Sequence, residues 1–510
     1  MFFSTYPSSL VSKFSVTISK FNIRNFICLI IKFVYNKFNK LGELIIVEFR
    51  NLIESYQEDI ISETQKLVRI RSVEEAQMEG KPFGSGPYNA LKYAIDLAER
   101  LGFETEDFDG YAAHADLGEG EESVGILVHL DVVPEGDGWT YNPYGGEIHD
   151  GKIYGRGTVD DKGPAIAGLY AMKALADAKV PLKRKIRIIF GTNEETGWGC
   201  MKHYFSKVDP PTMAFTPDAN FPVIYAEKGI IIFNLEYQVD DMDNEFKLID
   251  IKAGSAPNMV ADTAMVTLEV KNVEEFAKGV NLYKEKYDAP ISIDIDGNRV
   301  IMMAKGISAH GSTPEKGENA ISYLMDCLGG IIDDNSSFMK FVRIYKERIG
   351  FSHYGEKIGC GFEDEMTGKL NFNPGMIKYQ DGKIILTINI RYPISYNSKK
   401  VYDGIRENLS DTGIVLVEGK FEQKPLYVSE DNFLVEKLME VYRKVTGDFD
   451  SKPITTGGGT YARAMKNAVA FGPMFPGQKE LAHQKDEFIS IEHLMRITEI
   501  YANALYELAK

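Results

Sequence analysis

The chain has 510 residues, of which 44% are hydrophobic and 26% charged, and its formal net charge is −16. This length exceeds what one hydrophobic core usually supports, so we expect at least two domains. The acidic balance argues against nucleic acids and anionic membranes as partners. Four cysteines without a C-x-x-C spacing indicate no disulfide framework and a reducing, cytoplasmic location.

The first 46 residues differ from the rest of the chain in composition. Residues 1–42 contain six basic residues and no acid. Their longest apolar run, Phe26–Ile31, is too short to span a bilayer, and no small-residue cleavage site follows it. We therefore expect residues 1–46 to lie outside the working enzyme and translation to start at Val47.

An alternation of helices and strands follows, from residue 47 to about residue 226. Tyr56–Arg71 has the apolar spacing of an amphipathic helix. Val124–Leu130 is typical of a buried strand, and Lys185–Phe190 of a strand with alternating side chains. This order predicts an α/β catalytic domain with a central, mostly parallel sheet.

Acidic and imidazole side chains follow the ends of these elements. They lie in V-H-L-D at 128–131, in G-R-G-T-V-D-D-K-G at 155–163 and in T-N-E-E-T-G at 192–197. Singly, an H-x-D, a D-D helix cap or an E-E pair is common and structural. Together, at the carboxyl ends of strands where α/β proteins bind ligands, they indicate a hydrolytic two-metal centre.

The spacing within these segments suggests how the side chains are used. Because side chains alternate along a strand, His129 and Asp131 point to the same side, where the Asp carboxylate can accept the imidazole N–H. One carboxylate of the Asp160–Asp161 pair can bridge two cations. Of Glu194 and Glu195, one can bind metal while the other takes a proton from the attacking water.

The chain beyond residue 226 has two parts. Strand-rich segments with long polar connections run from 227 to 426, and we expect this insert to be an α+β lid domain. The catalytic fold resumes over 427–510 and ends in a helix, Ile491–Leu508. Two more candidate metal ligands flank the insert: Asp218 in T-P-D-A and His483 in L-A-H-Q-K-D-E.

These motifs resemble one enzyme family, from about Val47 to the C-terminus. It is the co-catalytic metallopeptidase family that contains aminoacylase, glutamate carboxypeptidase and succinyl-diaminopimelate desuccinylase. Within it, the sequence is most similar to the bacterial PepV-type dipeptidases, also called Xaa-His dipeptidases or carnosinases. The segments that carry the resemblance are H-L-D-V-V-P-E-G-D-G-W (129–139), G-R-G-T-V-D-D-K-G-P (155–164), T-N-E-E-T-G (192–197), T-P-D-A-N-F-P (216–222), S-A-H-G-S-T-P-E-K-G-E-N-A (308–320), N-I-R-Y-P (389–393) and G-G-G-T-Y-A-R (457–463).

The resemblance implies a role for each residue of the metal site. Two divalent ions per chain would share five ligands, with Asp160 common to both ions: His129, Asp160, Asp218, Glu195 and His483. Glu194 would be the general base, and Asp131 would lie behind His129. Zinc is the first expectation, and the same ligands also suit manganese and cobalt. The Asp160–Asp161 peptide bond is expected to be cis.

The resemblance also implies the substrate contacts. His310 of the lid would stabilise the oxyanion, and Arg391 would bind a substrate carboxylate with its planar fork. The other implied substrate-binding residues are Asn258, Gly458, Gly459 and Thr460. The lid would consist of two ferredoxin-like halves. Its doubled size would let His310 reach the site within one chain, so we expect a monomer.

The sequence therefore predicts a two-metal dipeptidase that hydrolyses small peptides through a metal-bridging water and a Glu general base. One alternative is an N-acyl-amino-acid or succinyl-diaminopimelate deacylase with the same site. Another is a non-catalytic relative that only binds peptides, which the complete ligand set and base disfavour. The long insert, and an Asp rather than a Glu at position 218, favour the peptidase over the deacylase.

Overall fold

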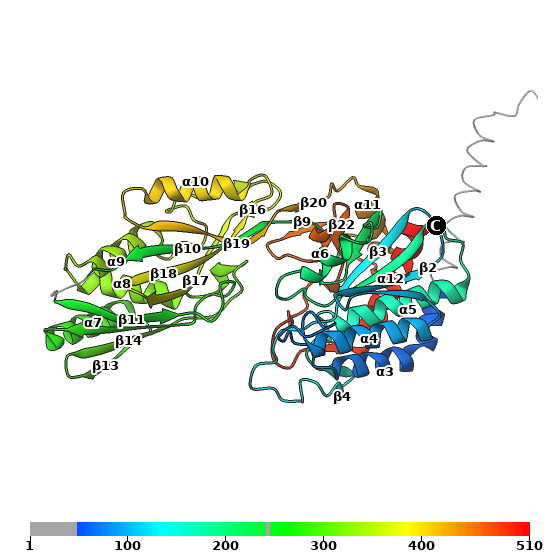
Figure 1. Ribbon diagram of the computed structural model, residues 1–510, viewed down its shortest axis with the longest axis horizontal. Helices are drawn as coiled ribbons and strands as arrows, with labels where there is room; N and C mark the ends of the chain where they lie inside the picture. The colour runs from blue at the N-terminus through cyan, green and yellow to red at the C-terminus, as the bar shows by residue number, and fades with distance from the viewer. Residues whose placement is uncertain (1–47, 241–244) are drawn as a thin grey trace, which may run out of the picture.

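The computed structural model describes residues 48–240 and 245–510. The predictions for residues 1–46 and for a start at Val47 lie outside the described residues. Figure 1 shows two bodies side by side, and each contains one of the two large sheets. Each sheet has its own cluster of buried apolar side chains, so the protein has two hydrophobic cores.

The first sheet has nine strands, in the order β1-β2-β6-β3-β7-β22-β9-β20, with β21 paired to β9. Its centre, from β6 through β3 and β7 to β22, is parallel. Most of its outer strands pair antiparallel, whereas β21 pairs parallel with β9. The sheet is therefore mixed rather than mostly parallel. The strands are β1 (Glu104–Phe108), β2 (Ala112–Leu117), β3 (Ser123–His129), β6 (Lys185–Gly191), β7 (Met213–Thr216), β9 (Ile224–Glu227), β20 (Leu426–Tyr427), β21 (Ile454–Thr456) and β22 (Ala468–Ala470).

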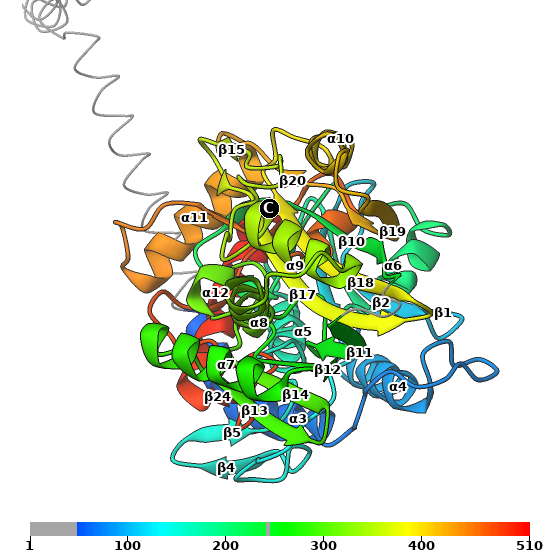
Figure 2. The same cartoon turned by 90° about the vertical axis from the view of Figure 1, so that its left-hand side faces the viewer.

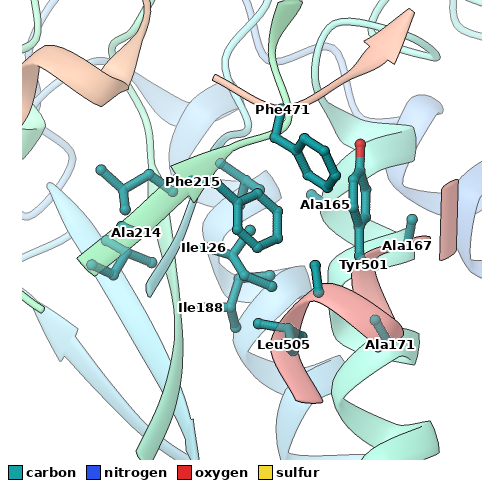
Figure 3. Close-up of a cluster of buried hydrophobic side chains, with 14 of the residues drawn as sticks. Ile126, Ala165, Ala167, Ala171, Ile188, Ala214, Phe215, Phe471, Tyr501 and Leu505 are labelled. Atoms are coloured by element: carbon teal, nitrogen blue, oxygen red, sulfur yellow. The ribbon is translucent and has the colours of Figure 1, made fainter. Parts of the chain in front are cut away.

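Helices pack on this sheet through apolar side chains. They are α3 (Gln57–Val68), α4 (Ser85–Arg100), α5 (Lys162–Ala178), α6 (Gly199–Phe205), α11 (Phe433–Thr446), α12 (Ile491–Ala509) and the short 3-10 helix η2 (Tyr461–Ala464). In Figure 3, Phe215 and Phe471 of the sheet side face Tyr501 of α12, next to the small residues of α5. Burial of these groups fixes the central strands, and with them the residues that follow their ends.

The second sheet has eight strands in the order β13-β14-β12-β11-β17-β18-β10-β19, and all neighbours are antiparallel. This body faces the viewer in Figure 2, and its sheet is accompanied by helices. The strands are β10 (Gly229–Gln238), β11 (Phe246–Ala253), β12 (Thr263–Val270), β13 (Ile291–Asp296), β14 (Arg299–Lys305), β17 (Asn371–Gln380), β18 (Lys383–Tyr392) and β19 (Val415–Gln423). The helices are α7 (Val273–Tyr287), α8 (Ala320–Ile331), α9 (Ser337–Arg348) and α10 (Ser398–Leu409).

Short elements complete the described fold. Small sheets are formed by β24 (Phe488–Ser490) with β5 (Lys152–Tyr154) and β4 (Glu147–His149), by β23 (Pro473–Met474) with β8 (Ala219–Asn220), and by β15 (Glu363–Asp364) with β16 (Gly368–Lys369). A 3-10 helix, η1, spans Pro314–Lys316. Among the described helices, none combines the length and apolar character needed to cross a membrane.

The chain passes between the two bodies at two neighbouring points. It leaves the first sheet at the end of β9 and enters the second at Gly229, with only Lys228 between them. It returns between the end of β19 at Gln423 and the start of β20, where Leu426 pairs with Glu227. We call these segments, 227–229 and 423–426, the two crossings.

Candidate metal centre and active site

His129 is the last residue of β3, a strand whose apolar side chains are buried. Its Nδ1 lies 3.0 Å from the backbone carbonyl oxygen of Asp131. A carbonyl oxygen only accepts hydrogen bonds, so Nδ1 donates and Nε2 is the nitrogen left for a metal. Nε2 is buried without a hydrogen-bond partner and lies 2.8 Å from Asp160 Oδ1. The sequence suggested that the Asp131 carboxylate would fix this tautomer, whereas the structure gives that role to the carbonyl.

The Asp131 carboxylate instead holds the Glu194–Glu195 segment. Its Oδ1 accepts the backbone N–H of Glu194 and its Oδ2 that of Glu195, both at 3.0 Å. Burial raises the pKa of Asp131 to about 6. Both adjacent glutamates therefore depend on Asp131 for their backbone position, a connection that strand alternation alone does not reveal.

Asp160 lies between two histidines. Its Oδ1 is 2.8 Å from Nε2 of His129, and its Oδ2 is 3.1 Å from Nε2 of His483. Burial opposes ionisation of Asp160, but the two histidines outweigh it and lower its pKa far below the ordinary value. The Asp160–Asp161 peptide bond is cis, which confirms the prediction. Asp161 Oδ2 accepts the backbone N–H of His129 at 3.2 Å.

The remaining predicted ligands lie beside the same carboxylate. Glu195 Oε2 is 3.1 Å from His483 Nε2, and Asp218, just after β7, has Oδ1 3.8 Å from His129 Nε2. Ligand atoms of His129, Asp160 and Glu195 all lie within 4.8 Å of one another, as do those of His129, Glu194 and Asp218. The fold thus brings together all five residues predicted as metal ligands.

Glu194 lies at the edge of this cluster. The indole N–H of Trp198 donates to its Oε1 at 3.0 Å. Burial, followed by the negative charge of Asp218, raises the pKa of Glu194 well above its ordinary value. A carboxylate with a raised pKa holds a proton more readily, which suits a group that must take up a proton and release it.

The charges of the cluster fit bound cations. Six carboxylates come together, those of Asp131, Asp160, Asp161, Glu194, Glu195 and Asp218. Among the described residues, only histidines form ion pairs with these carboxylates. Burial lowers the pKa of His129, but Asp160 and Asp218 outweigh this and raise it well above the ordinary value. The environment of Nε2 therefore favours a positive charge. Oxygen and imidazole donors in this mixture suit zinc, manganese or cobalt.

A buried ion pair supports the turn that carries Asp160. Glu487 Oε1 accepts the N–H of Val159 at 2.9 Å, and its Oε2 pairs with Arg156 Nη1 at 2.7 Å. The same Nη1 donates to the backbone carbonyl of Gln484, next to His483, at 3.1 Å. We call Arg156–Glu487 the metal-side pair. Both residues stand inside motifs seen in the sequence, but nothing local to either motif shows that they meet.

His310, from the second body, lies near the metal ligands of its own chain. Its Nδ1 is 2.6 Å from Ser312 Oγ. The ring is accessible to solvent but densely surrounded by protein. This surrounding, together with the positive charges of Arg391 and His483, lowers the pKa of His310. His310 is therefore close enough to His483 of the same chain to feel its charge.

Arg391, near the end of β18, is buried without an acidic partner among the described residues. Its Nε donates to Asn389 Oδ1 and its Nη1 to the carbonyl of Gly457, both at 3.1 Å. Burial and the charge of Arg463 lower the pKa of Arg391 to about 9. A buried guanidinium that bonds only to neutral oxygens is well suited to receive a carboxylate.

Asn258 is held next to His310 through the backbone. Its carbonyl accepts the N–H of Gly311 at 2.7 Å. The amide of Asn373, on β17, donates to the carbonyls of Pro257 and Met259, both at 2.9 Å. Asn373 therefore fixes the loop on each side of Asn258. It lies in no motif, so the sequence did not single it out.

The Gly457–Thr460 loop is tied into the protein more tightly than expected. The N–H and hydroxyl of Thr460 both donate to Glu227, and the N–H of Gly458 donates to Thr456 Oγ1 at 3.0 Å. Within the described residues, the N–H groups left for a ligand are those of Gly457 and Gly459. A Cβ atom on Gly457 would lie only 2.9 Å from Cβ of Ser312, so this loop directly contacts the His310 segment.

Comparison with known proteins identifies the family of the chain. The family model "Peptidase family M20/M25/M40" matches residues 125–507. YtjP of Bacillus subtilis (strain 168), named as a candidate dipeptidase, is 40% identical over 460 residues, covering 89% of this chain and 98% of that protein. A candidate dipeptidase of Staphylococcus haemolyticus is 37% identical over 469 residues, covering 90% and 99%.

Solved structures share the fold. Human carnosine dipeptidase 1 matches with a TM-score of 0.55 and 17% identity, over 91% of this chain and 98% of that one. The family model and the curated relatives confirm the metallopeptidase family indicated by the motifs. The chain belongs to peptidase family M20/M25/M40 and is a peptide-bond hydrolase.

Proposed function

We propose that this protein is a two-metal dipeptidase that hydrolyses the amide bond of free dipeptides. The observation that carries the proposal is Asp160, whose two carboxylate oxygens each reach a different histidine beside Glu194. Its relatives in Bacillus subtilis and Staphylococcus haemolyticus, which match over nine-tenths of the chain, carry the name dipeptidase. The two ions are proposed to be zinc, held by His129, Asp160, Asp218, Glu195 and His483.

The chemistry assigned to the chain's own groups is proton transfer and charge stabilisation. When bound, the two cations supply Lewis acidity and lower the pKa of an attacking water. Glu194 accepts the proton of that water and later donates it to the leaving amine. Trp198 and the backbone anchor at Asp131 hold Glu194 in place for both steps. His310 donates to the oxygen on which negative charge develops.

Recognition of the substrate is assigned to the lid and to the glycine loop. Arg391 pairs with the substrate carboxylate, and its bond to Gly457 keeps the guanidinium at the loop. Asn258 and the N–H of Gly459 contribute further polar contacts, and Gly458 and Thr460 shape the loop. A dipeptide suits this arrangement because its carboxylate lies a short distance from the single peptide bond.

The domain organisation belongs to the same proposal. We divide the chain into catalytic segments at 47–226 and 427–510 and a lid at 227–426, which the change of sheet at both crossings supports. The lid would comprise two ferredoxin-like halves, one with β11–β14 and one with β10 and β17–β19. The contact of the Gly457 loop with the His310 segment of the same chain supports a monomer. The three free, buried cysteines among the described residues support a cytoplasmic enzyme.

A side-by-side assay tests this proposal. The purified protein, loaded separately with zinc, manganese and cobalt, is given β-alanyl-histidine, Ala-Ala and N-succinyl-diaminopimelate. We expect cleavage of at least one dipeptide at a kcat/KM far above that for the succinyl substrate. Cleavage of the succinyl substrate alone would replace the dipeptidase by a deacylase with the same metal site.

A further inference from the structure

Arg463, the last residue of G-G-G-T-Y-A-R, forms a buried ion pair with Glu227. Its Nε lies 2.5 Å from Glu227 Oε2, and the two side chains are 5% and 0% exposed. Glu227 is the last residue of β9 and the first residue of the first crossing. We call Arg463–Glu227 the hinge pair.

The other donors of Arg463 reach both crossings. Its Nη2 donates to the carbonyl of Lys228 at 2.6 Å, in the first crossing, and its Nη1 to that of Lys424 at 3.0 Å, in the second. Nη2 also donates to the carbonyl of Gly458 at 2.8 Å. One planar guanidinium thus joins the two connections of the lid to the glycine loop.

The glycine loop contacts the hinge pair, the second crossing and the lid. Glu227 accepts the N–H and the hydroxyl of Thr460, the latter at 2.7 Å. A Cβ on Gly459 would lie 2.5 Å from Gln423 Oε1, at the second crossing, so a larger residue there would displace the Gln423 side chain. The loop in turn binds the lid arginine through the carbonyl of Gly457 and Arg391.

We propose that Arg463 and Glu227 are positioning residues that hold the lid crossings and the glycine loop in one arrangement, and that they set substrate affinity rather than the rate of bond cleavage. The part of this inference that concerns substrate rests on the proposed dipeptidase function. Neither residue is within reach of the metal ligands by any contact seen in the structure. Their influence passes through Gly457 to Arg391, the residue assigned to the substrate carboxylate.

Arg463→Lys is the most direct test, because it retains the positive charge and removes the planar set of guanidinium donors. A lysine ammonium cannot donate simultaneously to Glu227 and to the three carbonyls, so the crossings separate from the loop. Glu227→Gln is the second variant, because an amide oxygen can still accept from Thr460 while the ion pair is lost. Glu227→Gln provides the test of the hinge pair if Arg463→Lys does not fold.

Arg187→Lys provides a matched control. Arg187, on β6, pairs with Asp116, on β2, through two bonds of 2.7 and 2.6 Å, and both side chains are largely buried. This pair belongs to the catalytic sheet and contacts neither crossing. Arg187→Lys therefore has a comparable effect on a buried ion pair without affecting the hinge.

Hydrogen exchange of the full-length, metal-loaded protein is the first measurement, and it needs no substrate. We expect Arg463→Lys to accelerate exchange about 10-fold or more in residues 224–230, 422–427 and 454–464, and Arg187→Lys to leave these segments unchanged. Unchanged exchange there in both hinge variants would overturn the inference. Because this result does not depend on activity, it stands apart from any failure of the dipeptidase assignment.

Kinetics on a cleaved dipeptide are the second measurement. Loss of bonds to a charged group should raise KM about 10- to 100-fold in Arg463→Lys, with a smaller rise in Glu227→Gln. We expect kcat to change little, because the metal ligands and Glu194 stay in place. A fall in kcat with an unchanged KM would assign the pair to the chemical step and contradict the inference.

Discussion

The two sides of the candidate site carry opposite charge. On the metal side, at the carboxyl ends of the catalytic strands, six carboxylates gather with only histidines as ion-pair partners among the described residues. On the lid side, Arg391 is buried among neutral oxygens, and His310 stands beside it. One side is thus arranged to hold cations and the other to hold an anion. A dipeptide presents a carbonyl to the first and a carboxylate to the second.

Each side is supported by a buried arginine–glutamate pair of similar design. In both pairs, a fully buried glutamate accepts backbone N–H groups of the loop it supports, and the arginine binds carbonyls of another segment. The metal-side pair, Arg156–Glu487, joins the Asp160 turn to the His483 loop. The hinge pair, Arg463–Glu227, joins the glycine loop to the crossings. Disturbing each side separately should therefore affect different steps.

The largest effect is expected on the metal side, from Glu194→Gln. The amide cannot accept the proton of water, so kcat should fall about 10²- to 10⁴-fold. Metal content, measured by elemental analysis, should stay near that of the wild type, because Glu194 is not among the five assigned ligands. Glu195→Gln is the matched contrast and should lose metal as well as activity. Appreciable turnover by Glu194→Gln would mean that another group is the base.

On the lid side, Arg391→Lys should raise KM rather than lower kcat. Loss of a charge-assisted, two-pronged contact costs about 2–3 kcal/mol, or roughly 30- to 150-fold in KM. The preference for a dipeptide over its C-terminal amide should be strong in the wild type and weaker in the variant, because lysine keeps the charge but loses the two-pronged contact. Arg406→Lys, at an exposed lid pair with Glu418, is the control and should change neither constant. An unchanged preference for the free acid in Arg391→Lys would show that Arg391 does not bind the substrate carboxylate.

Glu487→Gln tests the metal-side pair independently of the hinge pair. The Asp160 turn and the His483 loop lose their common support, so affinity for the divalent ion should fall about 10- to 100-fold. Titration calorimetry with zinc measures this change. Excess metal should restore kcat, and KM for the dipeptide at saturating metal should match that of the wild type. Wild-type metal affinity in a folded Glu487→Gln protein would show that the turn needs no such support.

The smallest effect concerns the stability of the metal-free protein. Burial, then the charge of Asp160, raises the pKa of Asp218 to about 7. A carboxyl whose pKa is raised by folding stabilises the protein while protonated, and this contribution disappears as pH rises through the folded-state pKa. We therefore expect Tm to fall by a few degrees between about pH 4 and about pH 7, the unfolded-state and folded-state pKa values of Asp218.

Thermal unfolding of the metal-free wild type and of Asp218→Asn measures the contribution of Asp218 to stability. Asp218→Asn removes the titrating group, so its Tm should fall less over the same pH range than that of the wild type. Saturating zinc should flatten the wild-type curve, because the cation replaces the proton at the carboxylate. An identical pH dependence of Tm in both metal-free proteins would show that folding does not raise the pKa of Asp218.

The ligands could be anticipated because their signal is local. His129 ends β3, Glu195 and Asp218 lie just after β6 and β7, and Asp160 lies just before α5. The ends of parallel strands meet at one edge of a sheet. His483 lies in a loop and was indicated by its motif alone. The role of Asp131 was harder to anticipate, because strand alternation places its side chain but does not show that the carbonyl is nearer to the imidazole. Glu227, which binds both Thr460 and Arg463, lies more than two hundred residues from them, and sequence periodicity does not predict such contacts.

The mixed pairing of the first sheet has a similar explanation. Central strands are buried on both faces and read as apolar runs, which favour a parallel interpretation. β1 and β2 form a hairpin, and β20 returns from the lid, so their direction follows from the path of the chain rather than from side-chain pattern. Residue type predicted which segments are strands but not the direction in which the outer ones run.

The position of β22 has a consequence for the order of synthesis. This strand lies between β7 and β9, although the whole second body separates it from them along the chain. A growing chain therefore completes the lid while the first sheet still has a gap between two of its strands. His483 and α12 follow later still, so the metal-binding cluster is assembled only when nearly all of the described chain has left the ribosome. Protein synthesis itself thus keeps the peptidase inactive until its lid is in place.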